Sequence, residues 1–274
     1  MTSKIEWCDH TINVVTGCKH GCPYCYAGKM TKVYANRWHV DPDFKPAFHE
    51  ERLREIIKAT GIVFVVSMGD LFGEWVPFEW IHETMMAVKQ NEGKATFVFL
   101  TKNPARYEEL LKEHPSLVAR ENVWLGTTLD AGYKSTGWDE YPTGYDHPMV
   151  IHHDTPSVPD RLKAIAELDY PRKWISVEPY LPEHARLYEF CLDDIDVQWV
   201  VFGVRTNPTT RLTPHDKDAL WKLWNMLRNQ GKAIFVKDSI VAQMSGTRQL
   251  MAPREFPAGV RLATKTNEWK PKVR

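Results

Sequence analysis

Seven short apolar runs alternate with helix-like segments along this chain of 274 residues, and this alternation restricts the fold more than any other feature. The runs are rich in Val, Ile, Phe and Trp and lie at 11–17, 62–70, 95–102, 122–130, 173–180, 197–205 and 232–239. They are mostly continuous rather than alternating in polarity, which is typical of strands buried on both faces of a parallel sheet. The pattern predicts an α/β fold with right-handed crossovers, as a complete or partial TIM-like barrel. A doubly wound open sheet would produce the same pattern.

The segments between the runs carry signals for the beginning and end of helices. Gly61 and Gly93 follow two segments with helical spacing of apolar residues, as expected of C-cap glycines. Another segment opens with Thr213, Pro214 and Asp216, which predicts an N-cap followed by a first-turn proline. Helices are therefore expected to connect the strands through most of the chain.

Each apolar run ends on its carboxyl side with a polar residue. These residues are Cys18, Asp70, Lys102, Thr128 and Asp130, Glu178, Arg205, and Lys237 and Asp238. The carboxyl ends of parallel strands meet at one edge of a sheet, where α/β proteins place their ligand sites. Loop ends are polar by default, so one such residue means little. The whole series favours a shared polar site.

Three of the five cysteines fall in the stretch TGCKHGCPYCYAGKM, residues 16–30. Cys18, Cys22 and Cys25 have the spacing C-x3-C-x2-C and follow the first predicted strand directly. Three thiolates can hold a 4Fe–4S cluster while one iron stays without a protein ligand, and an open iron can bind a cofactor. The position and spacing of these cysteines thus permit a 4Fe–4S cluster at the carboxyl edge of the sheet.

A structural zinc site is the alternative explanation of the same cysteines. Such a site usually has four Cys or His ligands, often from two paired knuckles. No second C-x2-C occurs in the chain, but Cys8, His10 or His20 could supply the fourth ligand. In that case the protein would be a non-catalytic nucleic-acid-binding protein stapled by zinc.

The cysteine spacing, with the aromatic Tyr24 before the last cysteine, resembles the cluster motif of radical S-adenosylmethionine (SAM) enzymes. IEWCDHTINVVTGC, SMGDLF, FLTKNPARY, NVWLGTTLD, ISVEPYL and WVVFG resemble, in order, segments of a phage- and bacteria-associated radical-SAM-like family without an assigned reaction, related to spore photoproduct lyase. The resemblance covers residues 4–130 and 173–240. It implies a partial (β/α)6 barrel at 1–240 with the cluster at its open top, an insertion at 131–160 and a C-terminal extension at 241–274.

In that superfamily the open iron binds S-adenosylmethionine, and reductive cleavage yields methionine and a 5′-deoxyadenosyl radical. The resemblance therefore implies two cofactors, a 4Fe–4S cluster and S-adenosylmethionine, and a reductase or other electron donor as partner. It places Asp70 at the methionyl amine, and Thr128 and Asp130 at the ribose hydroxyls. The residues that it assigns to the cofactor are Tyr24, Ser67, Gly69, Asp70, Thr128 and Asp130, and those that it assigns to catalysis are Lys102, Glu178 and Arg205.

The chain departs from the family pattern at two places. The sixth strand ends in Gly203-Val204-Arg205-Thr206 where the family has a Gly-Gly-Glu-Ser-like sequence, so a basic residue replaces an acid. This change is compatible with an alternative in which the protein is a degenerate barrel that keeps the cluster but has lost S-adenosylmethionine binding. Position 8 is Cys8 where a threonine is expected, and a small buried residue is the simpler interpretation.

Basic and aromatic residues gather around the cysteines. From His10 to Val40 there is no acidic residue, and the basic and aromatic residues there are Lys19, Lys29, Lys32, Arg37, Tyr24, Tyr26, Tyr34 and Trp38. Such a surface suits a DNA, RNA or nucleotide substrate through phosphate contacts and base stacking. The alternatives are a solvated face, and a peptide or small-metabolite substrate. The net charge of zero argues against an overall polyanion-binding field, but not against a local patch.

Residues 131–160 are the longest region without periodicity, and their Gly, Pro and aromatic content favours a partly ordered lid. His147, His152, His153 and Asp154 lie in it, but their spacing matches no standard metal site. No apolar run is long enough to span a bilayer, and the N-terminal residues lack the features of a signal peptide. We expect a cytoplasmic protein without a membrane partner.

Overall fold

The computed structural model describes residues 3–22, 24–38, 40–118, 120–130, 155–205, 209–244 and 252–260. Most of the predicted lid, including His147, His152, His153 and Asp154, lies outside these ranges. Within them, no helix is both long and apolar enough to cross a membrane.

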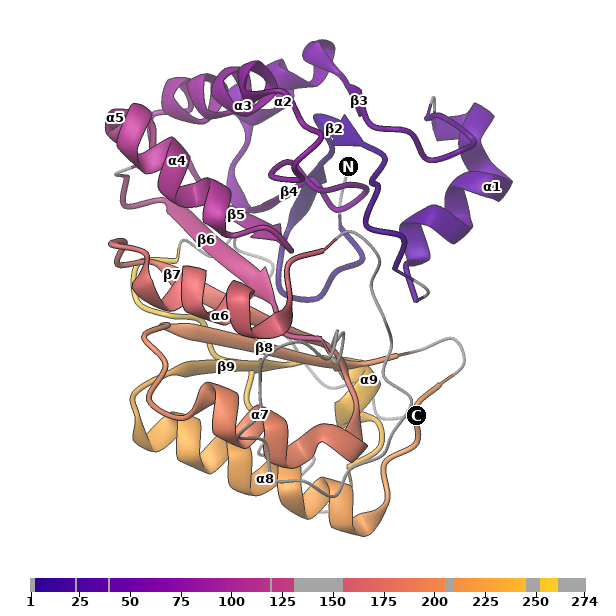
Figure 1. The fold of residues 1–274 in the computed structure, drawn as a ribbon, viewed down its shortest axis with the longest axis vertical. Helices are drawn as coiled ribbons and strands as arrows, with labels where there is room; N and C mark the ends of the chain where they lie inside the picture. Colours follow the sequence, from indigo (N-terminus) through magenta and orange to yellow (C-terminus); the bar gives the residue numbers. More distant parts are fainter. Residues whose placement is uncertain are drawn as a thin grey trace.

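Seven parallel strands form one sheet in the order in which they occur in the chain, β1-β4-β5-β6-β7-β8-β9. The strands are β1 (His10–Ile12), β4 (Gly61–Val65), β5 (Ala95–Thr101), β6 (Val123–Thr128), β7 (Lys173–Tyr180), β8 (Trp199–Val204) and β9 (Ala233–Val236). The sheet curls into a half-barrel (Figure 1). The predicted α/β partial barrel is therefore confirmed, because a doubly wound sheet would reverse its strand order.

The first predicted strand, 11–17, is divided in the structure. Its second part forms β2 (Val15–Thr16), which pairs antiparallel with β3 (Ala47–Phe48) outside the main sheet. This small ribbon ends immediately before the cysteine loop, so that it fixes where the loop begins.

Helices α2 (Leu53–Lys58), α3 (Phe78–Gln90), α4 (Ala105–Glu113), α5 (Pro115–Val118), α6 (Val158–Glu167), α7 (Ala185–Leu192) and α8 (Pro214–Asn229) connect the strands, with 3-10 turns at Glu50–Arg52 and Pro182–His184. They cover the outer face of the sheet, where Ile81 and Met85 of α3 share a core cluster with Val63 of β4. Thr213 caps α8 and forms the expected capping box with Asp216. In contrast, α1 (Tyr26–Trp38) stands away from the other elements (Figure 1).

Large aromatic rings fill the inner, concave face of the sheet. Trp7, from the N-terminal segment, lies 5.2 Å from Trp174 of β7 and 5.7 Å from Trp199 of β8, measured between ring centroids. Cys8 belongs to the same cluster, which confirms that it is a small buried residue, and burial raises the pKa of its thiol to about 12. The barrel interior is thus a packed core, as in other α/β barrels.

Glu6, in the N-terminal segment, and Arg254, in the C-terminal segment, meet beside the last strand. The Glu6 carboxylate accepts hydrogen bonds of 2.6 Å from the Asp238 backbone N–H, at the start of α9 (Asp238–Val241), and from the Arg254 guanidinium. Arg254 in turn forms an antiparallel bridge with Phe235 of β9. Residues 253–255 of the predicted C-terminal extension therefore cover the edge of the sheet.

Candidate functional site

A cavity of about 600 Å³ opens at the carboxyl ends of the strands. Its volume lies within the range of ligand pockets. All but one of the residues that the sequence assigns to the cluster, the cofactor or catalysis line it, namely Cys18, Cys22, Tyr24, Cys25, Ser67, Gly69, Asp70, Lys102, Thr128, Glu178 and Arg205. The exception is Asp130. The strand ends thus gather around one space, as expected for a parallel sheet.

The cysteine loop is fixed by close backbone contacts at its beginning. Gly17 has a φ of +87°, and a Cβ there would lie 2.1 Å from the Lys45 carbonyl oxygen, so a larger residue cannot occupy this position. The Gly17 N–H donates to Met68 O at 2.9 Å, which joins the loop to the SMGD segment, residues 67–70. A Cβ on Gly69 would lie 2.8 Å from Gly17 O. Gly69 therefore permits this contact as well as lining the cavity.

The third cysteine lies at the beginning of α1. The Gly28 backbone N–H donates to Cys25 Sγ at 3.4 Å. N–H groups at a helix N-terminus donate hydrogen bonds to negatively charged ligand atoms, so this contact orients the Cys25 sulfur at the beginning of the helix.

The donor set fits an iron–sulfur cluster by its chemistry. Thiolates are soft ligands that select zinc, copper(I) and iron–sulfur clusters. Burial raises the pKa of Cys18 and Cys22, so that without a metal both thiols hold their protons at neutral pH. Metal binding would displace these protons. Among the described residues, no three His, Cys, Asp or Glu side chains are already close enough to surround a metal ion.

Asp70 lies buried beside this loop and is fully engaged by the protein. Its Oδ2 accepts hydrogen bonds from His20 Nε2 at 2.8 Å, Thr101 Oγ1 at 3.0 Å and the Lys102 N–H at 3.0 Å, while Oδ1 accepts from the Phe72 N–H at 2.9 Å. Burial alone would raise the pKa of Asp70, but these bonds, led by that of His20, lower it. Asp70 thus links His20, which lies between Cys18 and Cys22 in the sequence, to the carboxyl ends of β4 and β5.

A buried polar network joins the cysteine loop to β5, β6 and α6. The Asp130 carboxylate accepts hydrogen bonds from Tyr24 Oη and Lys102 Nζ on Oδ2, and from Arg161 Nη2 at 2.7 Å on Oδ1. Lys102 Nζ also lies 2.9 Å from Tyr24 Oη, and Arg161 Nη1 donates to the Thr128 carbonyl at 2.7 Å. Burial, reinforced by the Asp130 charge, raises the pKa of Tyr24 well above its usual value. We call Asp130, Tyr24, Lys102 and Arg161 the Asp130 network.

Asp130 is 0% exposed and its carboxylate accepts hydrogen bonds from three donors, so in the structure it contacts other residues of the site and not the cavity. Thr128 is the ribose-site candidate that lines the cavity. Sequence analysis did not find Arg161, which is 1% exposed. A signal was present, because Arg161 interrupts the apolar face of α6 that Val158, Leu162 and Ile165 form.

The strands at the other end of the sheet supply a second set of polar groups. Glu178 Oε1 accepts a hydrogen bond of 2.5 Å from Lys237 Nζ, and Glu178 Oε2 accepts one of 3.0 Å from Ser176 Oγ. Arg205 is exposed and lies at the cavity lining beyond them. Lys237 was recognised in the sequence as a strand-end residue but not as a member of the site.

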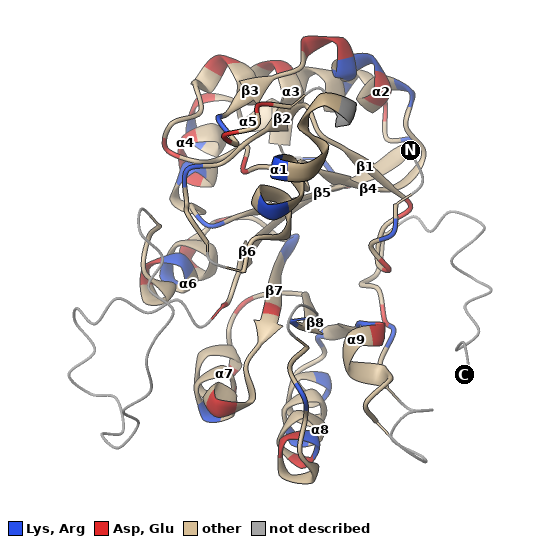
Figure 2. Ribbon diagram, turned by 90° about the vertical axis from the view of Figure 1, so that its right-hand side faces the viewer, with Lys and Arg blue, Asp and Glu red and all other residues tan. Residues whose placement is uncertain are grey.

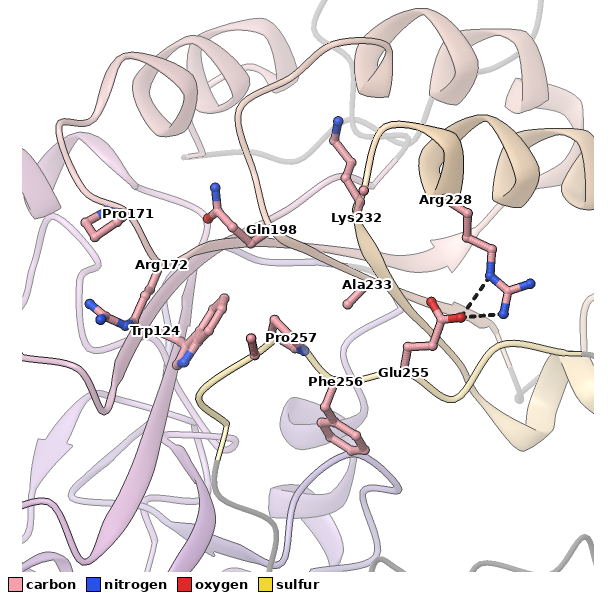
Figure 3. A pocket seen from close by; sticks show the side chains of 12 residues that line it. Trp124, Pro171, Arg172, Gln198, Arg228, Lys232, Ala233, Glu255, Phe256 and Pro257 are labelled. Atoms are coloured by element: carbon pink, nitrogen blue, oxygen red, sulfur yellow. Dashed lines mark hydrogen bonds and ion pairs between the residues drawn. The ribbon is translucent and has the colours of Figure 1, made fainter.

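Another cavity, of about 700 Å³, lies at the opposite, amino ends of β6–β9 (Figure 3). Arg172, Gln198 and Lys232, each directly before a strand, line it together with Phe256 and Pro257. Its acidic residue, Glu255, is bound by Arg228 and by the Ile234 N–H. None of the predicted site residues lines this cavity.

Residues 2–136 match the family model described as a protein of unknown function, DUF5131. The matched part includes the cysteine loop, the SMGD segment, Lys102 and Asp130. No curated protein matches the chain.

Proposed function

We propose that the protein is a radical S-adenosylmethionine enzyme in which Cys18, Cys22 and Cys25 hold a 4Fe–4S cluster. One observation carries the proposal: three thiols from a single short loop line the same cavity as the polar carboxyl ends of the strands. When bound, the cluster and S-adenosylmethionine would supply reductive cleavage to methionine and a 5′-deoxyadenosyl radical, which abstracts a hydrogen atom from the substrate. A reductase or other electron donor would supply the electron.

The protein's own residues would position the reactants and exclude water. Ser67, Gly69 and Thr128 are the proposed cofactor contacts, and Asp70 acts by fixing His20 and the backbone at Lys102. The Asp130 network holds Tyr24, and with it the cysteine loop, against Lys102 and Asp130 at the strand ends. Trp7 and Phe64 close the cavity towards the barrel interior.

The residues that could complete a zinc site are placed for other contacts. The Cys8 thiol donates to Ser3 Oγ at 3.2 Å, and His20 Nε2 bonds to Asp70. His10 begins β1 at its amino end, whereas the cysteine loop follows the carboxyl end. The placements of Cys8 and His10 favour the cluster over a zinc site completed by either of them, whereas a carboxylate on one ring nitrogen, as at His20, is also usual for a zinc-bound histidine.

Anaerobically reconstituted protein, given a chemical reductant and S-adenosylmethionine, is expected to release 5′-deoxyadenosine and methionine in equal amounts. Quantification of both products by mass spectrometry tests the proposed chemistry. If the protein holds a full cluster but leaves the cofactor intact, it would instead be a degenerate barrel that has lost S-adenosylmethionine binding, the alternative suggested by Arg205.

For the substrate we propose a nucleic acid or nucleotide, which would be modified or repaired at a base. Helix α1 presents Tyr26, Val33 and Tyr34 with exposed fractions of 52%, 71% and 40%, although most aromatic rings in the described part of the chain are buried. Lys29 and Lys32 are exposed beside them, and Lys29 also lines the cavity. Figure 2 shows basic and no acidic segments on α1. Phosphates would bind the lysines, and bases would stack on the tyrosines.

Replacement of Lys29 and Lys32 by glutamine is expected to weaken binding of a single-stranded oligonucleotide and to flatten its salt dependence. Each lost phosphate contact reduces the slope of log K against log salt by about 0.7 for single strands. Fluorescence anisotropy across a salt series measures both effects. The matched control is Lys58→Gln with Lys89→Gln, which removes two exposed charges from α2 and α3. Equal slopes for the two double variants would rule out α1 as the phosphate-binding surface.

A further inference from the structure

The ion pair between Glu178 and Lys237 lies on the part of the cavity wall that β7–β9 build, at the other end of the sheet from the cysteine loop. Three neighbouring strands contribute to it. Glu178 belongs to β7, Lys237 follows β9, and between them β8 carries Gly203. A Cβ on Gly203 would lie 2.5 Å from Glu178 Oε1 and 2.9 Å from Lys237 Cδ, so the absence of a side chain makes room for the pair.

Both members of the pair keep hydrogen-bonding capacity towards the cavity. The Glu178 and Lys237 side chains are 25% and 22% exposed, whereas Asp130 is fully buried and Lys102 is held by Asp130 and Tyr24. An ammonium has three donors and a carboxylate about four acceptor positions, and the contacts described use only part of them. Burial would lower the pKa of Lys237, but the Glu178 charge raises it, so Lys237 keeps its positive charge.

A charged donor beside a charged acceptor is complementary to a ligand edge that presents an acceptor beside a donor. The Watson–Crick edge of every nucleobase has this arrangement, and in a duplex it is covered by the pairing partner. We propose that Glu178 and Lys237 bind the Watson–Crick edge of one unpaired base, so that the substrate is single-stranded or has that base extruded. This inference rests on the proposed nucleic-acid substrate and adds where, and by which edge, the base is bound.

The test compares two ligands on the reconstituted full-length protein by fluorescence anisotropy. One is a short oligouridine, and the other is the same oligomer methylated at N3 of every uracil, which removes the N–H from the Watson–Crick edge and leaves the phosphates unchanged. We expect the methylated oligomer to bind about tenfold more weakly or worse, as for loss of a good bidentate base contact. A duplex of the unmethylated oligomer should compete poorly.

Substitutions assign the effect to the pair. The double variant Glu178→Gln with Lys237→Met removes both charges together and leaves no buried charge unpaired. It is expected to bind both oligomers alike while its salt dependence stays that of the wild type. The Lys29→Gln, Lys32→Gln variant should show the opposite pattern, with a flatter salt dependence and unchanged sensitivity to methylation. Glu178→Gln alone provides a second, more conservative variant.

Equal binding of the two oligomers by the wild-type protein would overturn the inference, and so would undiminished sensitivity to methylation in the double variant. The assay needs no turnover. If the protein discriminates between the two oligomers but does not cleave S-adenosylmethionine, the proposed radical chemistry is therefore wrong and the proposed base site stands. If the protein cleaves the cofactor but binds the two oligomers equally, only the proposed base site is wrong.

Discussion

Alanine in place of Cys18, Cys22 or Cys25 is expected to prevent assembly of the 4Fe–4S cluster and to abolish cleavage of S-adenosylmethionine. Each thiolate would bind a different iron, so loss of one leaves two irons without protein ligands and the cluster without a stable site. Iron analysis and the visible absorption of anaerobically reconstituted protein measure the effect. We expect about four irons per chain in the wild type and far fewer in each variant.

Cys191 provides the matched control. It is a half-buried cysteine on α7 that packs against the outer core cluster, away from the cavity lining. Cys191→Ala should retain the full iron content and cofactor cleavage. If the variants of the cysteine loop kept about four irons each, the loop would not be the cluster ligand set.

Replacement of Asp130 by alanine is expected to destabilise the folded protein by about 3–5 kcal/mol, because it leaves two cations without their shared carboxylate. Arg161 is 1% exposed and Lys102 is 12% exposed in its side chain, so water screens neither charge well. Urea denaturation of the metal-free protein measures the free energy of unfolding without a contribution from cluster binding.

An exposed ion pair serves as the control for this experiment. Lys112 and Glu108 lie on α4 with side chains 72% and 62% exposed, and Glu108→Ala should change the free energy of unfolding by less than about 1 kcal/mol. A comparably small effect of Asp130→Ala would show that the Asp130 network does not hold the cysteine loop against the sheet. Asp130 would then again be a candidate for direct contact with the cofactor.

The parts of the fold that depend on local pattern could be predicted from the sequence. Continuous apolar runs marked the strands, and Thr213 with Asp216 marked the start of α8, because each signal lies within a few residues. The division of the first run could not be predicted in this way. Val15–Thr16 leaves the sheet to pair with Ala47–Phe48, and nothing in the run itself indicates that partner.

The site shows the same limit. Strand-end position predicted which residues gather at the cavity, since the carboxyl ends of parallel strands share one edge. It did not predict which of them face a ligand and which face one another. Asp130 meets Arg161 across 31 positions of sequence, and Glu178 meets Lys237 across 59, and these pairings decide the role of each carboxylate.

The most direct test of the central proposal is the EPR spectrum of the reduced, anaerobically reconstituted protein, recorded with and without S-adenosylmethionine after iron and zinc have been measured. We predict about four irons per chain and a cluster signal that changes when the cofactor is added, because the iron without a protein ligand binds it. One zinc ion and no cluster signal would contradict the proposal. In that case the cysteine loop would form a structural zinc site.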